Sequence, residues 1–316
     1  MGCATAWALT ERGADVTVYE QYEIDHDRGS SHGRSRIVRL SYPDASWVRL
    51  AVQAMTAWRE LESETGADLI ELYGIVELVA DRSITSAAGL DECGVEYSWL
   101  DAAATRAFGV LLPDGWSAMF QPEAGIVRAD LARRAFLDAA IGRGARVETG
   151  QRVAAPEDLD EEVVVVTTGA WVRELVPDVP VQVTRETLAY FGRDGEPYPA
   201  IVELDEITRG HGMYSLHDPA YGLKAGVHHG GREVDPNDEG DADPASVGRV
   251  SEWVRERFPD VDPEPIGSET CLYTSTVDGS FVLERRGRVV VGSACSGHGF
   301  KFAPVVGRRL ASLALD

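Results

Sequence analysis

Lysine is almost absent from this sequence, although basic residues in general are not. The 316 residues include 30 lysine and arginine side chains, and the only lysines are Lys224 and Lys301. Each lies in a glycine-flanked segment, in Gly-Leu-Lys-Ala-Gly and in Gly-Phe-Lys-Phe. Lysine provides a compact ammonium group whose pKa shifts on burial, which arginine does not provide. Two lysines could remain by chance, but the pattern favours a chemical role for both.

The sequence also lacks features that would place it in other classes of protein. No apolar run approaches the roughly 18 residues of a membrane span, and no charged–apolar–small signal pattern opens the chain. The four cysteines show no CxxC pair and no metal-ligand spacing, so we predict no metal site and a reduced, cytoplasmic setting. A net charge of −22 argues against nucleic acid or an anionic membrane as a partner.

The start of the chain resembles part of a dinucleotide-binding βαβ unit. An Ala-rich segment closed by Gly13 predicts a helix, and Asp15–Glu20 predicts a strand that ends in a carboxylate. Glu20 stands where such a unit places its acceptor for the ribose hydroxyls, and Gly2 corresponds to the third glycine of GxGxxG. We therefore expect the first strand of the unit, with its first two glycines, to be missing from the chain as given.

Patterns further along indicate two lobes, as the length also suggests. A long amphipathic helix is predicted after Asp44, and a second over residues 129–143. The continuous apolar run Val163–Thr167 is typical of a strand covered on both faces, as in a parallel sheet. Between Val181 and Tyr273 short strands alternate with turns, which predicts an antiparallel second lobe threaded into the first.

The segment Arg288–Phe302 combines a run of β-branched residues with a glycine-rich turn, and an apolar helix is predicted over Val305–Leu315. A strand, a tight turn and a helix leave free backbone N–H groups at the start of the helix. Because the helix dipole points the same way, such a turn suits an electron-rich or anionic ligand.

Four motifs are distinctive when they occur together: Gly29–Arg39 (GSSHGRSRIVR), Gly222–His228 (GLKAGVH), Glu269–Thr274 (ETCLYT) and Ser296–Phe302 (SGHGFKF). They resemble motifs of the monomeric sarcosine oxidase and N-methyltryptophan oxidase family, FAD-dependent amine oxidases of the D-amino-acid oxidase superfamily. The resemblance implies an α/β fold with an FAD-binding Rossmann-like lobe, whose first strand is missing, and an interleaved, mostly antiparallel β substrate lobe. The implied domains are residues 1–70, 125–178 and 268–316 for FAD and residues 71–124 and 179–267 for the substrate.

The resemblance implies a site for FAD. Cys271 would form a thioether to the flavin 8-methyl group, although a buried cysteine that acts as a small hydrophobe is the commoner case. Glu20 would hold the ribose, and Val153 would offer its backbone to the adenine. The other cofactor contacts that it implies are Gly2, Thr168, Gly169, Trp171, Gly297, His298, Gly299 and Lys301.

The same resemblance implies catalytic and substrate-binding roles. Lys224 would lie beside the flavin N5 through a water and promote the reaction with oxygen, whereas its alternative is an exposed lysine at a sheet edge. Arg39 and Lys301 would clamp the substrate carboxylate. The remaining catalytic residues would be His32 and Arg36 near the flavin and His228, Tyr214 and Tyr273 around the substrate. The other histidines, left to loops or the surface, are His26, His211, His217 and His229.

These roles imply FAD-dependent oxidation of an amino-acid amine, such as a sarcosine-like N-methyl or other secondary amine. Oxygen would accept the electrons and leave as hydrogen peroxide, and the imine would hydrolyse to an aldehyde and an amine. Three alternatives remain: a dehydrogenase with a non-oxygen acceptor, an enzyme for a cyclic or glycated amino acid, and a non-catalytic remnant that lacks the central strand. We expect a monomer whose partners are the amine and O2.

Overall fold

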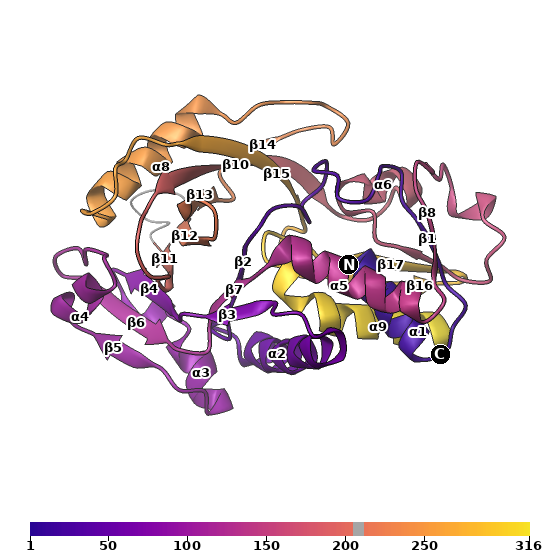
Figure 1. The fold of residues 1–316 in the computed structure, drawn as a ribbon, viewed down its shortest axis with the longest axis horizontal. Coiled ribbons are helices and arrows are strands. Elements are labelled where there is room, and N and C mark those ends of the chain that lie inside the picture. The colour runs from indigo at the N-terminus through magenta and orange to yellow at the C-terminus, as the bar shows by residue number, and fades with distance from the viewer. Residues whose placement is uncertain (205–211) are drawn as a thin grey trace.

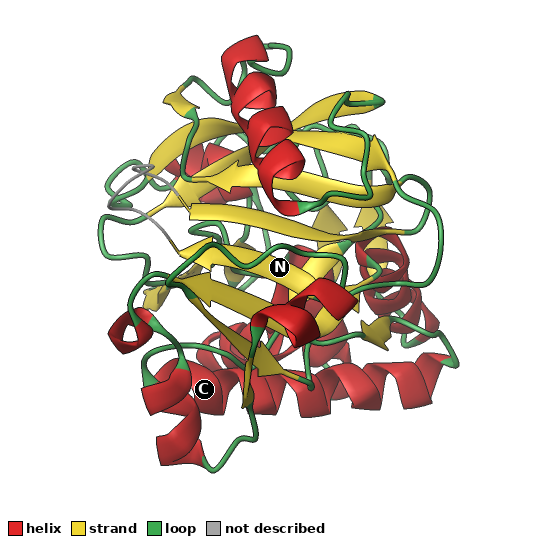
Figure 2. Ribbon diagram, turned by 90° about the vertical axis from the view of Figure 1, so that its left-hand side faces the viewer, coloured by secondary structure: helices red, strands yellow, loops and turns green. Residues whose placement is uncertain are grey.

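The computed structural model describes residues 1–204 and 212–316, and it shows a large β-sheet beside a layer of helices (Figures 1 and 2). The chain visits each side more than once, and both ends lie on the helical side (Figure 1). This arrangement confirms the predicted α/β fold with an interleaved, mostly antiparallel part. His211, assigned above to a loop or the surface, lies outside the described residues.

The large sheet has nine strands among the described residues. They run in the order β14-β10-β13-β12-β11-β4-β6-β5. Strands β13 and β14 pair with different parts of one edge of β10, and β15 pairs with its opposite edge. Every neighbouring pair is antiparallel except β11 and β4. The strands are β4 (Ile75–Val79), β5 (Ser98–Leu100), β6 (Ser117–Gln121), β10 (Gln182–Gly192), β11 (Ala200–Leu204), β12 (Gly212–Asp218), β13 (Gly222–His228), β14 (Arg232–Glu233) and β15 (Gly267–Ser275).

The register of this sheet places apolar side chains on one face and ionisable side chains, such as Lys224 and His228, on the other, which we call the chemically rich face. Successive side chains of a strand point to opposite faces, and paired residues share a face. On β13, Leu223, Ala225 and Val227 belong to the core beneath helix α8 (Pro244–Arg257), which Figure 2 shows lying across the sheet. Lys224 and His228 therefore point to the opposite face.

The helical part contains two short parallel strand pairs, with helices packed against one another beside them. β1 (Thr17–Tyr19) pairs with β8 (Arg146–Glu148), and β9 (Val164–Val166) pairs with β17 (Val289–Ser293), which also pairs with the antiparallel β16 (Val282–Arg286). Helix α1 (Gly2–Glu11) packs against α5 (Ala129–Gly142) and α9 (Ala303–Leu315). The approach of α1 to α9 is close, because a Cβ at Gly307 would lie 2.4 Å from the carbonyl oxygen of Ala4.

The two parallel strand pairs belong to separate sheets. Among the described residues, no strand pairs with the second edge of β1 or of β9. Residues Thr17–Tyr19 and Val164–Val166 line the same cavity. The parallel sheet predicted from the sequence is therefore present as two pieces with a space between them.

A further three-stranded sheet and one long helix join the two parts. The strands β2 (Arg36–Val38), β7 (Gly125–Val127) and β3 (Ile70–Leu72) lie in that order. Helix α2 (Ala45–Thr65) begins at Asp44, whose side chain accepts from the Ser46 N–H at 2.7 Å. The shorter helices and 3₁₀ turns are η1 (Arg82–Ile84), α3 (Ala87–Cys93), α4 (Ala102–Ala107), η2 (Pro156–Asp158), η3 (Gly169–Trp171), α6 (Val172–Leu175) and η4 (Phe300–Phe302).

Candidate active site

One cavity of about 1110 Å³ runs between the two parts of the molecule, and both lysines line it. It extends from the end of β1 at Glu20, past the start of α1, to the chemically rich face of the large sheet. Every residue that the sequence analysis assigned to cofactor or substrate lines this cavity: Gly2, Glu20, His32, Arg36, Arg39, Val153, Thr168, Gly169, Trp171, Tyr214, Lys224, His228, Cys271, Tyr273, Gly297, His298, Gly299 and Lys301. The fold therefore brings together residues from across the chain, while their individual roles stay predictions.

The β1 end of the cavity presents an oriented carboxylate. Glu20 accepts a hydrogen bond from the Tyr22 N–H at 3.0 Å and lies 3.6 Å from the His26 ring nitrogen. Burial alone would raise the pKa of Glu20, but the hydrogen bonds from His26 and Tyr22 outweigh it and lower the pKa. The carboxylate is thus ionised and can accept hydrogen bonds from hydroxyl groups. His26, left above to a loop or the surface, lines the cavity.

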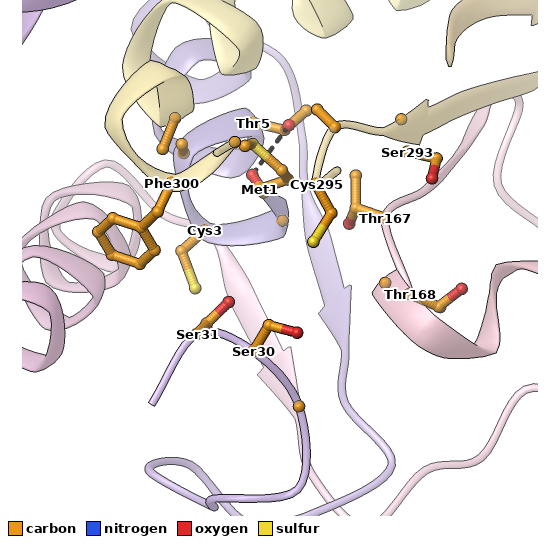
Figure 3. Close-up of a pocket in the computed structure, with 18 of the residues that line it drawn as sticks. Met1, Cys3, Thr5, Ser30, Ser31, Thr167, Thr168, Ser293, Cys295 and Phe300 are labelled. Carbon is orange, nitrogen blue, oxygen red and sulfur yellow. Dashed lines mark hydrogen bonds between the residues drawn. The ribbon is translucent and has the colours of Figure 1, made fainter. Parts of the chain in front are cut away.

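The start of α1 opens into the middle of the cavity. Figure 3 shows Cys3, Ser30, Ser31, Thr167 and Cys295 around one space there. The approach of α1 to the end of β9 is tight, because a Cβ at Gly2 would lie 3.0 Å from the Thr167 hydroxyl oxygen. Hydroxyl groups and a helix N-terminus are groups that interact well with phosphate oxygens.

Hydrogen bonds from Arg36 hold the loop 29–35 in place beside the sheet. The Arg36 guanidinium donates to the carbonyls of Ser30 and Ser35, at 3.1 and 2.9 Å, and to that of His32. The Ser30 hydroxyl donates to the Leu272 carbonyl, so the loop is attached to β15. Nε2 of His32 is buried with no hydrogen-bond partner among the described residues, and it is therefore available to a bound molecule.

Lys224 lies on the chemically rich face and is only 2% exposed. Burial, followed by the nearby Arg36 charge, lowers the pKa of Lys224 to about 8. Cys271 lies on the same face. Its partner on β10 is Glu186, which shares a face with Leu188, and Leu188 pairs with Gly226, which shares a face with Lys224. Burial raises the pKa of Cys271 to about 11, so the sulfur is a thiol at neutral pH.

A second pair of cations lies at the glycine-rich turn. Lys301 is 7% exposed, and its Nζ donates to the His298 carbonyl at 2.9 Å. The ring of Tyr42 lies against both cations, with its centroid 4.6 Å from Arg39 Cζ and 5.9 Å from Lys301 Nζ. Burial, then the charge of Arg39, lowers the pKa of Lys301 well below its ordinary value. Two cations that share one aromatic ring form a receptor for an anion.

Aromatic and imidazole side chains surround the remaining space. The Tyr273 hydroxyl lies 3.5 Å from Nδ1 of His228. Gly297, which adopts a φ of 73°, passes close to both rings, because a Cβ there would lie 2.5 Å from Tyr273 Cε2 and 2.7 Å from His228 Cε1. Burial and the charges of His229 and Arg39 lower the pKa of His228 to about 3, so the imidazole is neutral. His229, predicted to be a loop or surface residue, is exposed, and its ring lies tilted against that of His228 with the centroids 4.2 Å apart.

Two acidic residues of the site were not predicted. Glu269 Oε1 lies 3.4 Å from Lys224 Nζ, and Glu77 Oε1 lies 3.8 Å from Arg39 Nη1. Glu77 is fully buried and is held by the backbone N–H and hydroxyl of Ser86. Glu269 belongs to a motif quoted above, but its partner depends on strand register, which the motif does not give.

The residues present fit FAD. A single cavity contains, one after another along its length, a carboxylate suited to ribose hydroxyls, a helix start suited to phosphate, and a sheet face that carries cations and a thiol. His32 also has a free ring nitrogen toward this cavity. Among residues 1–204 and 212–316, no group of three or more His, Cys, Asp or Glu is arranged to hold a metal ion. No described helix is both long and apolar enough to cross a bilayer.

Comparison with known proteins identifies the class. Residues 1–313 match the FAD dependent oxidoreductase family, also called the DAO family, so the chain belongs to this family. Human peroxisomal sarcosine oxidase is 30% identical, with 99% of this chain and 89% of that protein aligned. N-methyl-L-tryptophan oxidase of Yersinia pestis is 29% identical, with 100% of this chain and 92% of that protein aligned.

Solved structures agree with this assignment. The open form of NikD, described as an unusual amino acid oxidase essential for nikkomycin biosynthesis, superposes with a TM-score of 0.86 at 26% identity. That comparison covers 99% of this chain and 91% of NikD. The predictions of the sarcosine oxidase family and of an FAD-dependent amine oxidoreductase are therefore confirmed. The relatives do not favour a dehydrogenase or a non-catalytic remnant.

Proposed function

We propose that the protein oxidises the amine of a small amino acid, of the sarcosine-like N-methyl or other secondary class, with O2 as the acceptor. The amine and the adjacent C–H together lose two electrons and two protons, which leaves an imine. Water adds to the imine and releases an aldehyde and an amine. Oxygen takes up the two electrons and two protons and leaves as hydrogen peroxide. Bound FAD supplies the two-electron acceptor that links these half-reactions.

The observation that carries this proposal is that Arg39 and Lys301 lie together in the cavity that also contains Lys224. Glu77 offsets the charge of Arg39. Lys301 has no acidic partner among the described residues, so a bound carboxylate would supply the opposite charge that favours its protonated form. A carboxylate held by both cations would fix the orientation of an amino acid, and the position of the carboxylate fixes the amine.

The groups near the clamp suit a neutral amine. His228 is uncharged near neutral pH, because its pKa is about 3. Burial, chiefly, raises the pKa of Tyr214 and of Tyr273, so both hydroxyls stay protonated. A substrate ammonium finds no acidic partner among these three side chains. We therefore expect the amine to bind and react as the free base, with activity rising as the substrate loses its proton.

Lys224 would serve the oxygen half-reaction. Negative charge develops on oxygen as it accepts electrons, and a nearby ammonium stabilises that charge most where water is excluded. Lys224 is buried against the cavity and carries a proton below about pH 8. His32 and Arg36 would hold the flavin side of the site through the free ring nitrogen and the ordered loop.

Cys271 would attach FAD covalently through a thioether to the flavin 8-methyl carbon. The S–C bond would replace the S–H bond and one methyl C–H bond, and O2, the acceptor proposed above, would take up the two electrons and two protons as hydrogen peroxide. Supporting this, the thiol lines the cavity beside Lys224 and Tyr273. Arg36 and Lys224 also act against burial, and both favour the thiolate. We further propose a monomer in a reducing cytoplasm, in keeping with the four free cysteines and the net charge of −22.

A panel of amines tests the function. The purified protein is mixed without oxygen with sarcosine, N-methyltryptophan, proline, glycine and a glycated amino acid, and loss of the oxidised-flavin absorbance is followed. Air is then admitted, and peroxide, aldehyde and amine are quantified. We expect one amine class to bleach the flavin, with one peroxide formed per amine consumed. Failure of every amine to bleach bound flavin would rule the proposal out, and bleaching without peroxide would favour a non-oxygen acceptor.

Acid precipitation tests the covalent link. A yellow pellet is expected from the wild-type holoenzyme, because the thioether survives acid. Cys271→Ser should give a colourless pellet and a yellow supernatant, and Cys93→Ser, at a cysteine that does not line the cavity, should behave like the wild type. A yellow supernatant from the wild type would contradict the attachment.

A further inference from the structure

Lys224 has a single acidic partner within the described residues, and that partner has no assigned role. The ammonium is 2% exposed, and its Nζ lies 3.4 Å from Oε1 of Glu269. The Glu269 side chain is 29% exposed, so it is only partly enclosed. A buried ammonium needs a partner of opposite charge, because burial disfavours its charged form.

The strand register explains why these two residues meet. Leu188 of β10 pairs with Gly226 on one side and with Glu269 on the other. Gly226 has no side chain, and Lys224 points to the same face two residues earlier. The long lysine side chain can therefore reach across β10 to β15. The loop 29–35 approaches the ammonium, since a Cβ at Gly33 would lie 3.7 Å from Lys224 Nζ.

Among the other groups around the ammonium, Arg36 acts against its charge, and Cys271 and Asp218 favour the charge less strongly than Glu269 does. The titratable or charged groups that face it from the neighbouring strands and the loop are Glu269, Cys271, Tyr190, Asp218, Arg36 and His32. Burial and then Arg36 lower the pKa of Lys224, and Glu269 is the strongest influence that raises it. In turn, Lys224 is the largest of the influences that outweigh burial and lower the pKa of Glu269.

We propose that Glu269 is a positioning residue for Lys224, whose carboxylate fixes the ammonium and keeps it charged for the reaction with oxygen. This inference rests on the proposed oxidase function, because it gives Lys224 its role. Glu269 does not touch the substrate in this scheme; it acts only through the lysine. A purely structural ion pair would stabilise the sheet but would not set the pH range of the oxygen reaction.

Replacing Glu269 by glutamine should remove the charge and keep the shape. Two unit charges about 4 Å apart near a protein surface interact strongly enough to move a pKa by roughly one to three units. The pKa of Lys224 should therefore fall from about 8 by that amount. At pH 7.5 the charged fraction would drop from roughly three quarters to a quarter or less. The rate of reoxidation by O2 at that pH should fall about threefold or more, and it should recover as the pH is lowered.

The scarcity of lysine makes a direct measurement possible. Holoenzyme grown on [6-13C]lysine should show two lysine resonances, and Lys301→Arg assigns them. Each resonance is followed against pH in the wild type, in Glu269→Gln and in Glu269→Asp, which keeps the charge. The matched control is Glu71→Gln, because Glu71 is a strand glutamate of 29% exposure with an Arg128 partner at 3.6 Å and does not line the cavity. Stopped-flow reoxidation of the reduced holoenzyme is measured over the same pH range.

The proposal predicts a lowered pKa of Lys224 in Glu269→Gln, a smaller change in Glu269→Asp and none in Glu71→Gln. The pH profile of reoxidation should shift together with the pKa read from the resonance. An unchanged Lys224 titration in Glu269→Gln would overturn it, whatever the enzyme oxidises. A shifted titration with an unshifted reoxidation profile would also overturn it, because Lys224 would then not act on oxygen. Failure of the proposed function is seen separately, as the absence of flavin bleaching by any amine.

Discussion

Lys301→Met tests the carboxylate clamp by removing one charge while nearly preserving side-chain shape. In the wild type the ionisable groups are the half-buried Arg39, its partner Glu77 at 3.8 Å, and the buried Lys301, whose Nζ donates only to the His298 carbonyl among the described groups. With Lys301 protonated the set carries one net positive charge, and the variant carries none; burial lowers the pKa of Lys301, and a bound carboxylate would raise it again and hold the proton. A hydrogen bond to a charged group contributes about 1.5–3 kcal/mol. We therefore expect affinity for the substrate carboxylate to fall roughly 10- to 150-fold.

Stability should change in the opposite direction. A buried ammonium without an acidic partner is costly, and replacing it by an apolar side chain removes that cost. The melting temperature of Lys301→Met should therefore equal or exceed that of the wild type. A loss of stability would indicate that the methionine does not fit and would make the variant unsuitable for the binding test.

The assay is titration of the oxidised holoenzyme with acetate, as a minimal carboxylate, followed by flavin absorbance. Lys224→Met is the matched control, since it also removes a buried lysine that lines the cavity. Its affinity for acetate should stay within a few-fold of the wild type, while its reoxidation by O2 slows. Equal acetate affinity in Lys301→Met and the wild type would refute the clamp.

Three further outcomes are expected. Gly297→Ala should lower flavin content and activity severely, as measured by absorbance, because the added Cβ would lie 2.5 Å from Tyr273 and φ is 73°. Reoxidation by O2 should be fast below about pH 8 and slow above it, because the Lys224 ammonium loses its proton there; a stopped-flow profile that rises through pH 8 would contradict this sign. Glu77→Gln should leave the Arg39 side chain less firmly held, because it removes the carboxylate 3.8 Å from the guanidinium. In steady-state assays it should therefore raise KM for the substrate more than it lowers kcat.

Much of the fold could be predicted because the decisive signals are local. The helix after Asp44 has a side-chain cap and a long apolar stripe, and it begins at the expected residue. Strand β13 spans the predicted motif residues Gly222–His228. The sheet β2-β7-β3 was not predicted, because strands of three residues such as Arg36–Val38 are too short for alternation to show.

Site residues could be predicted only where a motif contains them. Lys224 and Cys271 stand in distinctive segments, and both line the cavity. Glu77 lies in a run of buried apolar residues on β4, and nothing local shows that it faces Arg39 from another element. The Lys224–Glu269 contact depends on two strand pairings through β10, which are tertiary information. The roles of all these residues stay predictions until they are tested.

The close approach of α1 and α9 at Gly307 links helix packing to chemistry. Helix α9 follows η4 directly, and η4 contains Lys301. Any side chain at position 307 would meet the Ala4 carbonyl and force the two helices apart. Such a shift would also move the Lys301 ammonium. A substitution at this buried contact between two helices would therefore lower the rate of the reaction. Screens for lost activity should therefore find variants at this helix crossing as well as around the cavity.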